Sequence, residues 1–141
     1  MFSDSTLFGN VASSEAGGIS CSELSMTRFI RCNITNNVAP KGGGLWSQSS
    51  SQCSVADSFL GYNQATSLSG GAISATESAT VTVSGTTVVG NTAAEHGGAA
   101  YCDGSAKLMF QGLGLVVDNQ GARSIRLLPL CVCSQFCRRQ P

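Results

Sequence analysis

Charged side chains are scarce in this 141-residue chain, in which Asp, Glu, Lys and Arg together make up 11% of the residues. The few charges are also unevenly distributed. Residues 1–122 carry eight acidic and four basic side chains, a net charge of −4, whereas residues 123–141 carry four arginines and no acid. The body of the chain therefore offers no basic surface of the kind that binds nucleic acid.

Long apolar runs and a leader sequence are also missing. No stretch approaches the ~20 consecutive apolar residues that a membrane-spanning helix needs. The chain opens with Met1-Phe2-Ser3-Asp4, without the basic segment and apolar core of a signal peptide. The repeat described below is already under way at this point, so we expect the chain to be a fragment of a longer protein.

Residues for catalysis or metal binding are few. The single histidine, His96, adjoins a Gly pair and has no obvious partner, so we expect a solvated turn residue. The seven cysteines fit no metal-ligand spacing. Cys131, Cys133 and Cys137 form the closest group, but tetrahedral zinc needs four ligands, and both His96 and Cys102 are remote in sequence. We therefore predict no metal and no cofactor.

Small hydroxyl residues take the place of charge, with 21 Ser and 10 Thr. Ser, Thr and Gly are poor helix formers, and together they favour turns and β-surfaces. The period that begins at Gly70 shows this most clearly. Short strands are indicated at 72–74, 79–83 and 86–89, with polar turns between them. The pattern predicts three short strands in each repeat and no helix.

Two markers recur along the chain with one period. The first is an aliphatic residue, two spacers and Asn; its copies are Leu7/Asn10, Ile34/Asn37, Leu60/Asn63, Val88/Asn91 and Val116/Asn119. The second is a Gly pair, found at Gly17-Gly18, Gly43-Gly44, Gly70-Gly71 and Gly97-Gly98. The Asn residues follow one another by 27, 26, 28 and 28 positions, and the Gly pairs by 26, 27 and 27. Two independent markers with one period indicate a repeat array whose core grows along an axis.

Both markers have a structural explanation. Asn tolerates the left-handed backbone of a sharp corner, and its side-chain amide can hydrogen-bond from coil to coil at the strand spacing of about 4.8 Å. The five Asn residues should therefore form a ladder, with the five aliphatic residues stacked inside the coils. The glycines should form turns, because glycine reaches positive φ freely.

The tetrad Gly70-Gly71-Ala72-Ile73, combined with the aliphatic-x-x-Asn motif, resembles the repeats of chlamydial polymorphic outer membrane proteins. The hallmarks of that family are Gly-Gly-Ala-Ile and Phe-x-x-Asn. The resemblance covers about residues 7–119, although the Phe position is aliphatic in all five copies. It implies a right-handed parallel β-helix of the pectin-lyase type and a location at the cell surface or outside the cell.

We predict an all-β chain, a right-handed single-stranded parallel β-helix of about four to five coils over residues 1–122. The handedness follows the rule for parallel crossovers. Residues 123–141 do not continue the repeat and form a basic, Cys-containing tail. Two interpretations of this tail stay open, a disordered terminus and a cap across the open end of the solenoid.

The predicted function is that of a structural and interaction module of a surface or secreted protein, adhesin-like and without a catalytic site. The alternative is a fragment of a pectate-lyase- or polygalacturonase-like enzyme, which would need grouped carboxylates. Counted from the second Gly of each pair, Glu23 and Asp103 share a column but lie three coils, roughly 14 Å, apart. Glycosidase carboxylates are about 5 to 9.5 Å apart. Glu77 lies one column away from Asp103.

The same count places Trp46 and Tyr101 in neighbouring columns, where one buried and one surface aromatic is the simpler interpretation. It places Cys21 and Cys102 three coils apart and gives Cys32 and Cys53 no shared column, so all four should be free, mostly buried thiols.

The expected partners are other coils of a longer parent chain and a host-surface protein or glycan. Unpaired coil edges also predict self-association. Asn33-Ile34-Thr35 is an N-glycosylation acceptor if the chain enters a secretory pathway.

Overall fold

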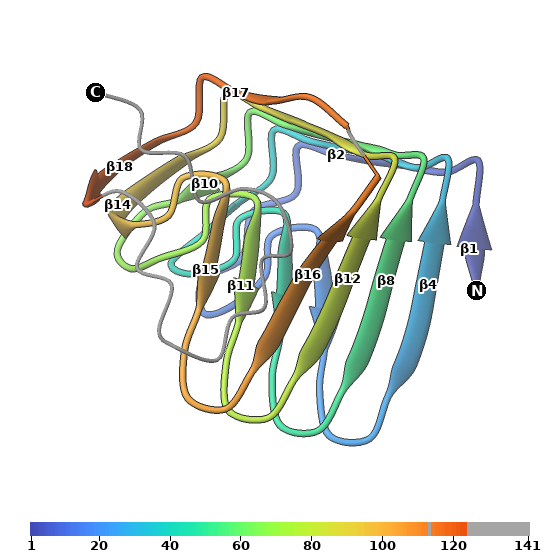
Figure 1. Ribbon diagram of the computed structural model, residues 1–141. Helices are drawn as coiled ribbons and strands as arrows, with labels where there is room; N and C mark the ends of the chain where they lie inside the picture. Colours follow the sequence, from blue (N-terminus) through green and yellow to red (C-terminus); the bar gives the residue numbers. More distant parts are fainter. Residues whose placement is uncertain (113, 124–141) are drawn as a thin grey trace.

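The computed structural model describes residues 1–112 and 114–123, and these residues form short parallel strands and no helix. The chain winds as a right-handed parallel β-helix of about four coils, with the coils stacked side by side (Figure 1). Successive coils pair through parallel ladders only. The predicted fold class is therefore confirmed. None of the described residues belongs to a helix that could cross a membrane.

Four sheets run along the axis of the solenoid, and each complete coil contributes one strand to each sheet. Sheet A contains β1 (Phe2–Ser3), β4 (Met26–Ile30), β8 (Gln52–Ala56), β12 (Thr80–Ser84) and β16 (Lys107–Gln111). Sheet B contains β2 (Thr6–Phe8), β5 (Asn33–Thr35), β9 (Phe59–Gly61), β13 (Thr87–Val89) and β17 (Val116–Val117). Sheet C contains β6 (Val38–Ala39), β10 (Gln64–Ala65), β14 (Thr92–His96) and β18 (Gln120–Arg123). Sheet D contains β3 (Ile19–Cys21), β7 (Leu45–Ser47), β11 (Ile73–Ala75) and β15 (Ala100–Cys102).

The prediction of three strands per repeat was wrong, because sheet C adds a fourth. Two of its strands, β6 and β10, are only two residues long. Two residues cannot show the alternation of apolar and polar side chains that reveals a strand in a sequence. The segment therefore looked like a plain return from the Asn to the next Gly pair.

The core is a set of stacked columns inside the coils. The predicted column of sheet B is present, because Ile34 pairs with Leu7 and Leu60, and Val88 pairs with Leu60 and Val116. Its three central members are fully buried, Leu7 is half-buried, and Val116 in the last coil is 38% exposed. Sheet A adds columns that contain Val81 with Leu108 and Val55 with Val83, and sheet D adds Leu45 with Ile73.

Four corners join the sheets, and every positive φ among the described residues lies at one of them. The A–B corner holds Asp4, Arg31, Asp57, Gly85 and Gly112. The B–C corner holds Gly9, Asn36, Tyr62, Gly90 and Asp118. The C–D corner holds Ala16, Gly42, Gly70 and Gly97, and the D–A corner holds Glu23, Ser49, Glu77 and Gly104. Each coil thus turns at four left-handed residues, one between each pair of sheets.

The predictions for the basic tail, including the group of Cys131, Cys133 and Cys137, fall outside the described residues except at Arg123, which ends β18.

Candidate functional site

The most regular polar feature of the molecule is a ladder of five asparagines along the B–C corner. In each coil the Asn backbone N–H and side-chain Nδ2 both donate to Oδ1 of the Asn in the next coil. The eight bonds measure 2.8–3.0 Å and connect Asn10, Asn37, Asn63, Asn91 and Asn119 in order. The second Nδ2 hydrogen of Asn63 donates to the Ile34 carbonyl, 2.9 Å away. The structure thus brings all five predicted ladder residues together.

The ladder asparagines do not take the left-handed conformation, and this part of the interpretation was wrong. The left-handed residue is the one before, such as Asn36 with a φ of 56° or Tyr62 with a φ of 57°. The corner turns at that residue and points the following Asn into the coil, where Asn37 and Asn63 have no exposed surface. Asn fits because its Oδ1 accepts from the backbone N–H and Nδ2 of the preceding coil, while its own Nδ2 donates to Oδ1 of the next coil.

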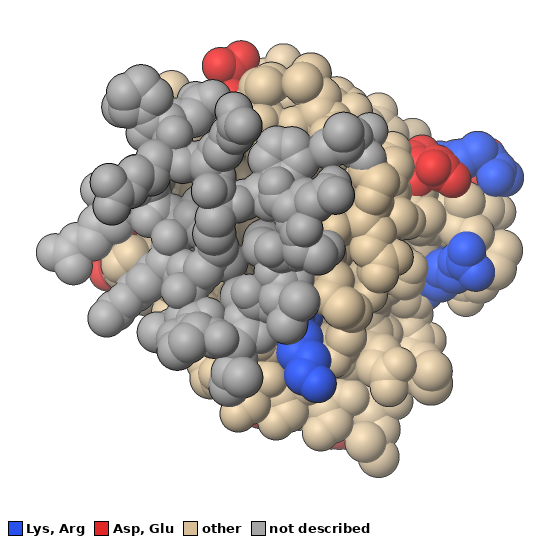
Figure 2. All heavy atoms as spheres, in the orientation of Figure 1, with Lys and Arg blue, Asp and Glu red and all other residues tan. Residues whose placement is uncertain are grey.

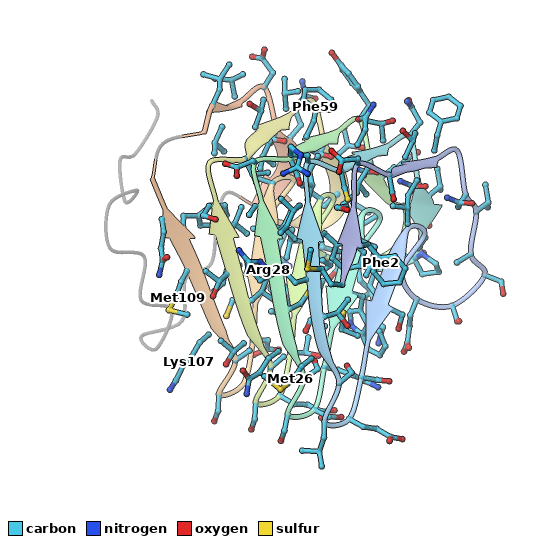
Figure 3. All side chains as sticks on the ribbon, turned by 90° about the vertical axis from the view of Figure 1, so that its right-hand side faces the viewer. Phe2, Met26, Arg28, Phe59, Lys107 and Met109 are labelled. Atoms are coloured by element: carbon cyan, nitrogen blue, oxygen red, sulfur yellow. The ribbon has the colours of Figure 1, made fainter. Side chains whose placement is uncertain are left out.

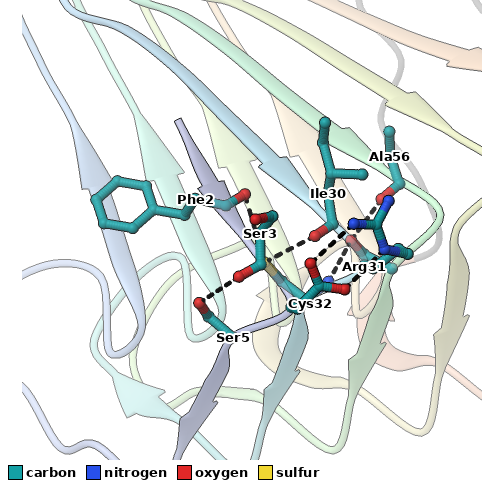
Figure 4. Close-up of polar contacts among 9 residues, drawn as sticks. Phe2, Ser3, Ser5, Ile30, Arg31, Cys32 and Ala56 are labelled. Atoms are coloured by element: carbon teal, nitrogen blue, oxygen red, sulfur yellow. Dashed lines mark hydrogen bonds and ion pairs between the residues drawn. The ribbon is translucent and has the colours of Figure 1, made fainter.

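A second polar column, missed in the sequence, follows the A–B corner. The backbone N–H of Cys32 donates to Ser58 Oγ over 3.0 Å, and the N–H of Ser58 donates to Thr86 Oγ1 over 3.3 Å. Each hydroxyl also donates within its own coil, Ser58 to Ala56 and Thr86 to Ser84. Cys32 occupies the same column, and its thiol donates to the Ile30 carbonyl (Figure 4). Because a different residue type occupies the position in successive coils, no single motif marks it.

The Gly pairs form the C–D corner, but their true register differs by one residue from the predicted one. The left-handed residues are Ala16, Gly42, Gly70 and Gly97, so the equivalent pairs are Ala16-Gly17 and Gly42-Gly43, then Gly70-Gly71 and Gly97-Gly98. The sequence 42–44 holds three glycines, which made the choice of pair ambiguous.

Glycine is required at the second position of these true pairs. A Cβ on Gly43 would lie 2.5 Å from the carbonyl oxygen of Gln64. The two other predicted turn glycines, Gly18 and Gly44, align with Ala72 and Ala99 of the later coils.

This shift of register regroups the carboxylates. Glu23 and Asp103 do not share a column, because Glu23 aligns with Ser49, Glu77 and Gly104 at the D–A corner. Glu23 and Glu77 are both exposed and lie two coils, roughly 10 Å, apart. In the part of the chain that the structure describes, no three His, Cys, Asp or Glu residues are grouped as metal ligands.

Among the described carboxylates, Glu15 pairs with Lys41 Nζ at 2.8 Å, and a pair through two nitrogens is made by Asp4. Arg31 lies directly above it at the A–B corner and binds it through two nitrogens, at 2.7 and 2.8 Å. This hydrogen bonding by Arg31 holds the pKa of the Asp4 carboxyl below its ordinary value. Both side chains are 60% exposed, so solvent screens the pair and its contribution to stability is small.

His96 has partners that the sequence did not reveal. Its Nδ1 lies 3.3 Å from Ser69 Oγ and 3.8 Å from Glu95 Oε2, and its ring lies 5.9 Å from that of Tyr101. A Ser–His–acid triad needs the hydroxyl on one ring nitrogen and the acid on the other. Here both groups face Nδ1, and Ser69 is buried. The group is therefore a corner contact and lacks the geometry of a nucleophile with its base.

Trp46 and Tyr101 share one outer column of sheet D, with Ser74 between them, and do not lie in neighbouring columns. Trp46 is 2% exposed, and Lys41 Nζ lies 4.5 Å from its ring centroid. The Tyr101 hydroxyl donates to Asp103 over 3.1 Å. The prediction of one buried aromatic is confirmed by Trp46, whereas Tyr101 is half-buried.

The outer face of sheet A carries a hollow with a volume of about 330 Å³. Its rim includes Met26 and Arg28, which point away from the coil interior in Figure 3. The remaining lining residues are apolar, hydroxyl, amide or thiol residues, and none is acidic: Met1, Thr27, Gln52, Cys53, Ser54, Thr80 and Thr82. The hollow therefore lacks the carboxylates that glycoside hydrolysis uses.

Cys21, Cys32 and Cys53 are free and buried, as predicted, and Cys102 is buried as well. Cys21 and Cys102 share one column three coils apart and are not in neighbouring columns.

Comparison with known proteins gave no match to a family model, a curated protein or a solved structure. The likeness to polymorphic outer membrane protein repeats rests on the repeated motifs alone.

Proposed function

We propose that this chain is a structural and interaction repeat module of a surface or secreted protein, adhesin-like, whose contribution is a regular surface. The observation that carries the proposal is the inward placement of the repeated polar residues. Asn37, Asn63 and Asn91 are fully buried, and their amides are occupied by neighbouring coils. Side chains used in this way build the coil stack and are withdrawn from any substrate.

The outer faces support the same proposal. On sheet A, the outward rows run from Met26 through Gln52 and Thr80 to Lys107, and from Arg28 through Ser54 and Thr82 to Met109 (Figure 3). Charges are sparse and scattered over the visible face of the described residues (Figure 2). Small polar groups at a fixed spacing suit repeated contacts with an extended partner, a host-surface protein or glycan.

Other coils are the second class of partner. The first coil leaves several large apolar side chains exposed, among them Phe8 at 65%, Val11 at 79% and Leu24 at 82%. Its strands β1, β2 and β3 lie at the edges of their sheets. We propose that this edge pairs with coils of a longer parent chain or of another copy.

The test presents the purified chain, tethered to beads, to a panel of glycans and cultured host cells. We expect binding that survives Glu77→Ala and Asp103→Ala, because no single surface side chain is essential. Binding should be lost in Asn63→Val, together with the β-sheet circular dichroism of the chain. No binding to any member of the panel would contradict the adhesive role.

A second arm addresses the enzyme alternative. The chain is incubated with polygalacturonate and other acidic glycans, with and without calcium, and product length is measured. The proposal predicts intact polymer. Chain cleavage that disappears in Glu77→Ala or Asp103→Ala would replace the structural proposal with a polysaccharide-active enzyme.

A further inference from the structure

Two buried thiols meet at the D–A corner of the first two coils. At this corner every coil turns between an inward residue of sheet D and an inward residue of sheet A. In order along the axis, these pairs are Cys21/Thr27, Ser47/Cys53, Ala75/Val81 and Cys102/Leu108. Cys21 and Cys53 are 2% and 3% exposed and belong to one core cluster.

The register makes Cys21 and Cys53 diagonal neighbours. Cys21 is the strand partner of Ser47, and Cys53 is the strand partner of Thr27, so one coil spacing of about 4.8 Å and one corner separate them. Backbone contacts hold the two segments together. The turn before Cys53 rests on the Cys21 carbonyl, which accepts from Gln48 N–H at 3.0 Å and Ser51 Oγ at 3.3 Å.

The two side chains also affect each other's ionisation. A hydrogen bond from the Cys53 side chain lowers the pKa of Cys21 to about 7, against the opposing effect of burial. The same contact, together with burial, raises the pKa of Cys53. Cys21 is thus the sulfur that ionises to the thiolate, and Cys53 is the neighbour that stays protonated.

We propose that Cys21 and Cys53 are a redox-active thiol pair that closes to a disulfide between the first and second coils. The oxidant is a small disulfide such as glutathione disulfide. The Cys21 thiolate attacks one of its sulfurs, which forms a mixed disulfide and releases one glutathione thiolate. Cys53 then loses its proton and attacks Cys21 Sγ, which releases the second glutathione thiolate. The protein gives up two protons and two electrons, and the oxidant becomes two glutathione molecules.

Neither Cys32 nor Cys102 is placed to form this link with Cys21. Cys32 lies at the A–B corner, where its thiol donates to the Ile30 carbonyl. Cys102 is three coils, roughly 14 Å, from Cys21, and a disulfide needs Cα atoms within ~7 Å. Access to the buried sulfurs requires local opening of the first coil, whose strand β3 lies at the edge of sheet D.

The experiment maps disulfides in the full chain after incubation in glutathione buffers of increasing oxidised fraction. Free thiols are blocked with N-ethylmaleimide, and the chain is digested with trypsin and a Glu-specific protease. Cleavage after Glu23, Lys41, Glu77 and Glu95 leaves the four described cysteines in four different peptides. The account predicts one dominant linked pair, which joins the Cys21 and Cys53 peptides. The same treatment in guanidinium provides the control for unselective pairing.

Two variants separate the pair from its neighbours. Cys53→Ala should abolish the link, whereas Cys32→Ala should leave it intact. Oxidation should raise the thermal midpoint of the parent chain and of Cys32→Ala by several degrees, and it should leave Cys53→Ala unchanged. The proposal is wrong if the folded chain links Cys21 to Cys32 or Cys102 as often as to Cys53, or if both thiols stay free in fully oxidised buffer.

Discussion

At the scale of single residues, the repeated polar side chains of this protein bind the backbone of the preceding coil. A buried backbone N–H that lacks an acceptor is costly. At the corners of a narrow solenoid the strands end, so buried N–H groups there need an acceptor from a side chain. The Asn ladder provides an acceptor at the B–C corner, and the hydroxyl column provides one at the A–B corner. In each coil the residue that belongs to either column directly follows a left-handed residue, because the left-handed residue turns the chain inward.

Asn63→Ala should therefore be strongly destabilising. It removes the acceptor for two donors of Asn37 and the donor to the Ile34 carbonyl, all in a fully buried environment. We expect a loss of about 3 kcal/mol in the free energy of unfolding, measured by chemical denaturation. The matched control is Asn36→Gly at an exposed left-handed position, which should change stability by less than about 0.5 kcal/mol. Equal effects of the two substitutions would contradict the ladder.

The cysteines provide a second comparison. Cys32 lies in the column that holds Ser58 and Thr86, so Cys32→Ser should be neutral or stabilising. Cys53 belongs to the hydrophobic core cluster, where its side chain meets the weakly polar Cys21 thiol, and Cys53→Ser should cost about 1–3 kcal/mol through burial of a hydroxyl. Thermal denaturation under reducing conditions measures both changes. A larger loss from Cys32→Ser than from Cys53→Ser would show that the hydroxyl column has been wrongly assigned.

At the scale of elements, the corners set how closely sheets and coils approach. The four left-handed positions accept Asp, Arg, Tyr or Glu where the side chain points outward, as at Asp57, Tyr62 and Glu77. The C–D corner is tighter, because sheet C packs directly against the residue after the turn. A Cβ on Gly71 would come closer than 3.0 Å to the carbonyl oxygens of Thr92 and Gly98.

Gly71→Ala should accordingly destabilise the protein by at least about 2 kcal/mol, since backbone has to move. Ala16→Gly should have the opposite effect. Ala16 has a φ of 48° in a column where the other three coils have glycine, and relief of that strain should add about 0.5–1 kcal/mol. Urea unfolding of the two variants beside the parent chain tests both signs. A stabilising Gly71→Ala or a destabilising Ala16→Gly would contradict the corner geometry.

The fold could be predicted because period and residue type agree in every coil. Ile34, Leu60 and Val88 each lie three residues before an Asn. This constant offset predicted that they face the core and stack once per coil along the whole array. Sheet C was missed because two of its strands, β6 and β10, are too short for an alternating pattern. The glycine register slipped because the left-handed position of the first coil holds Ala16 and the next holds the first of three glycines, Gly42. Positions counted from the first two Gly pairs were therefore shifted by one residue. The contact of Ser69 with His96 was within reach of the spacing, because each residue directly precedes a Gly pair whose register was predicted correctly.

At the scale of the whole molecule, the core of the solenoid is fully covered only in coils that have a neighbouring coil on both sides. The central coils bury their aliphatic columns fully, whereas Leu7 is half-buried and Val116 is 38% exposed. Apolar side chains of the first coil remain open as well.

Self-association through the first coil is therefore expected. Sedimentation velocity should show concentration-dependent oligomers for the parent chain, and the double variant Phe8→Lys, Val11→Lys should reduce them, because both side chains are more than half exposed at the sheet edge. The control is Leu68→Lys, which changes a 44% exposed residue between sheets C and D of a central coil. Oligomers that persist in the double variant but dissolve in the control would place the contact elsewhere.

The most direct test of the central claim, that the repeated asparagines hold the coils together, is hydrogen exchange of the Asn side-chain amides measured by NMR. The account predicts slowly exchanging Nδ2 protons for Asn37, Asn63 and Asn91, which are fully buried and bonded to the next coil. Asn33 and Asn36 are exposed and should exchange at the rate of free amides. If the side-chain amides of Asn37, Asn63 and Asn91 exchanged as fast as those of Asn33 and Asn36 in the folded chain, the ladder would not exist in solution.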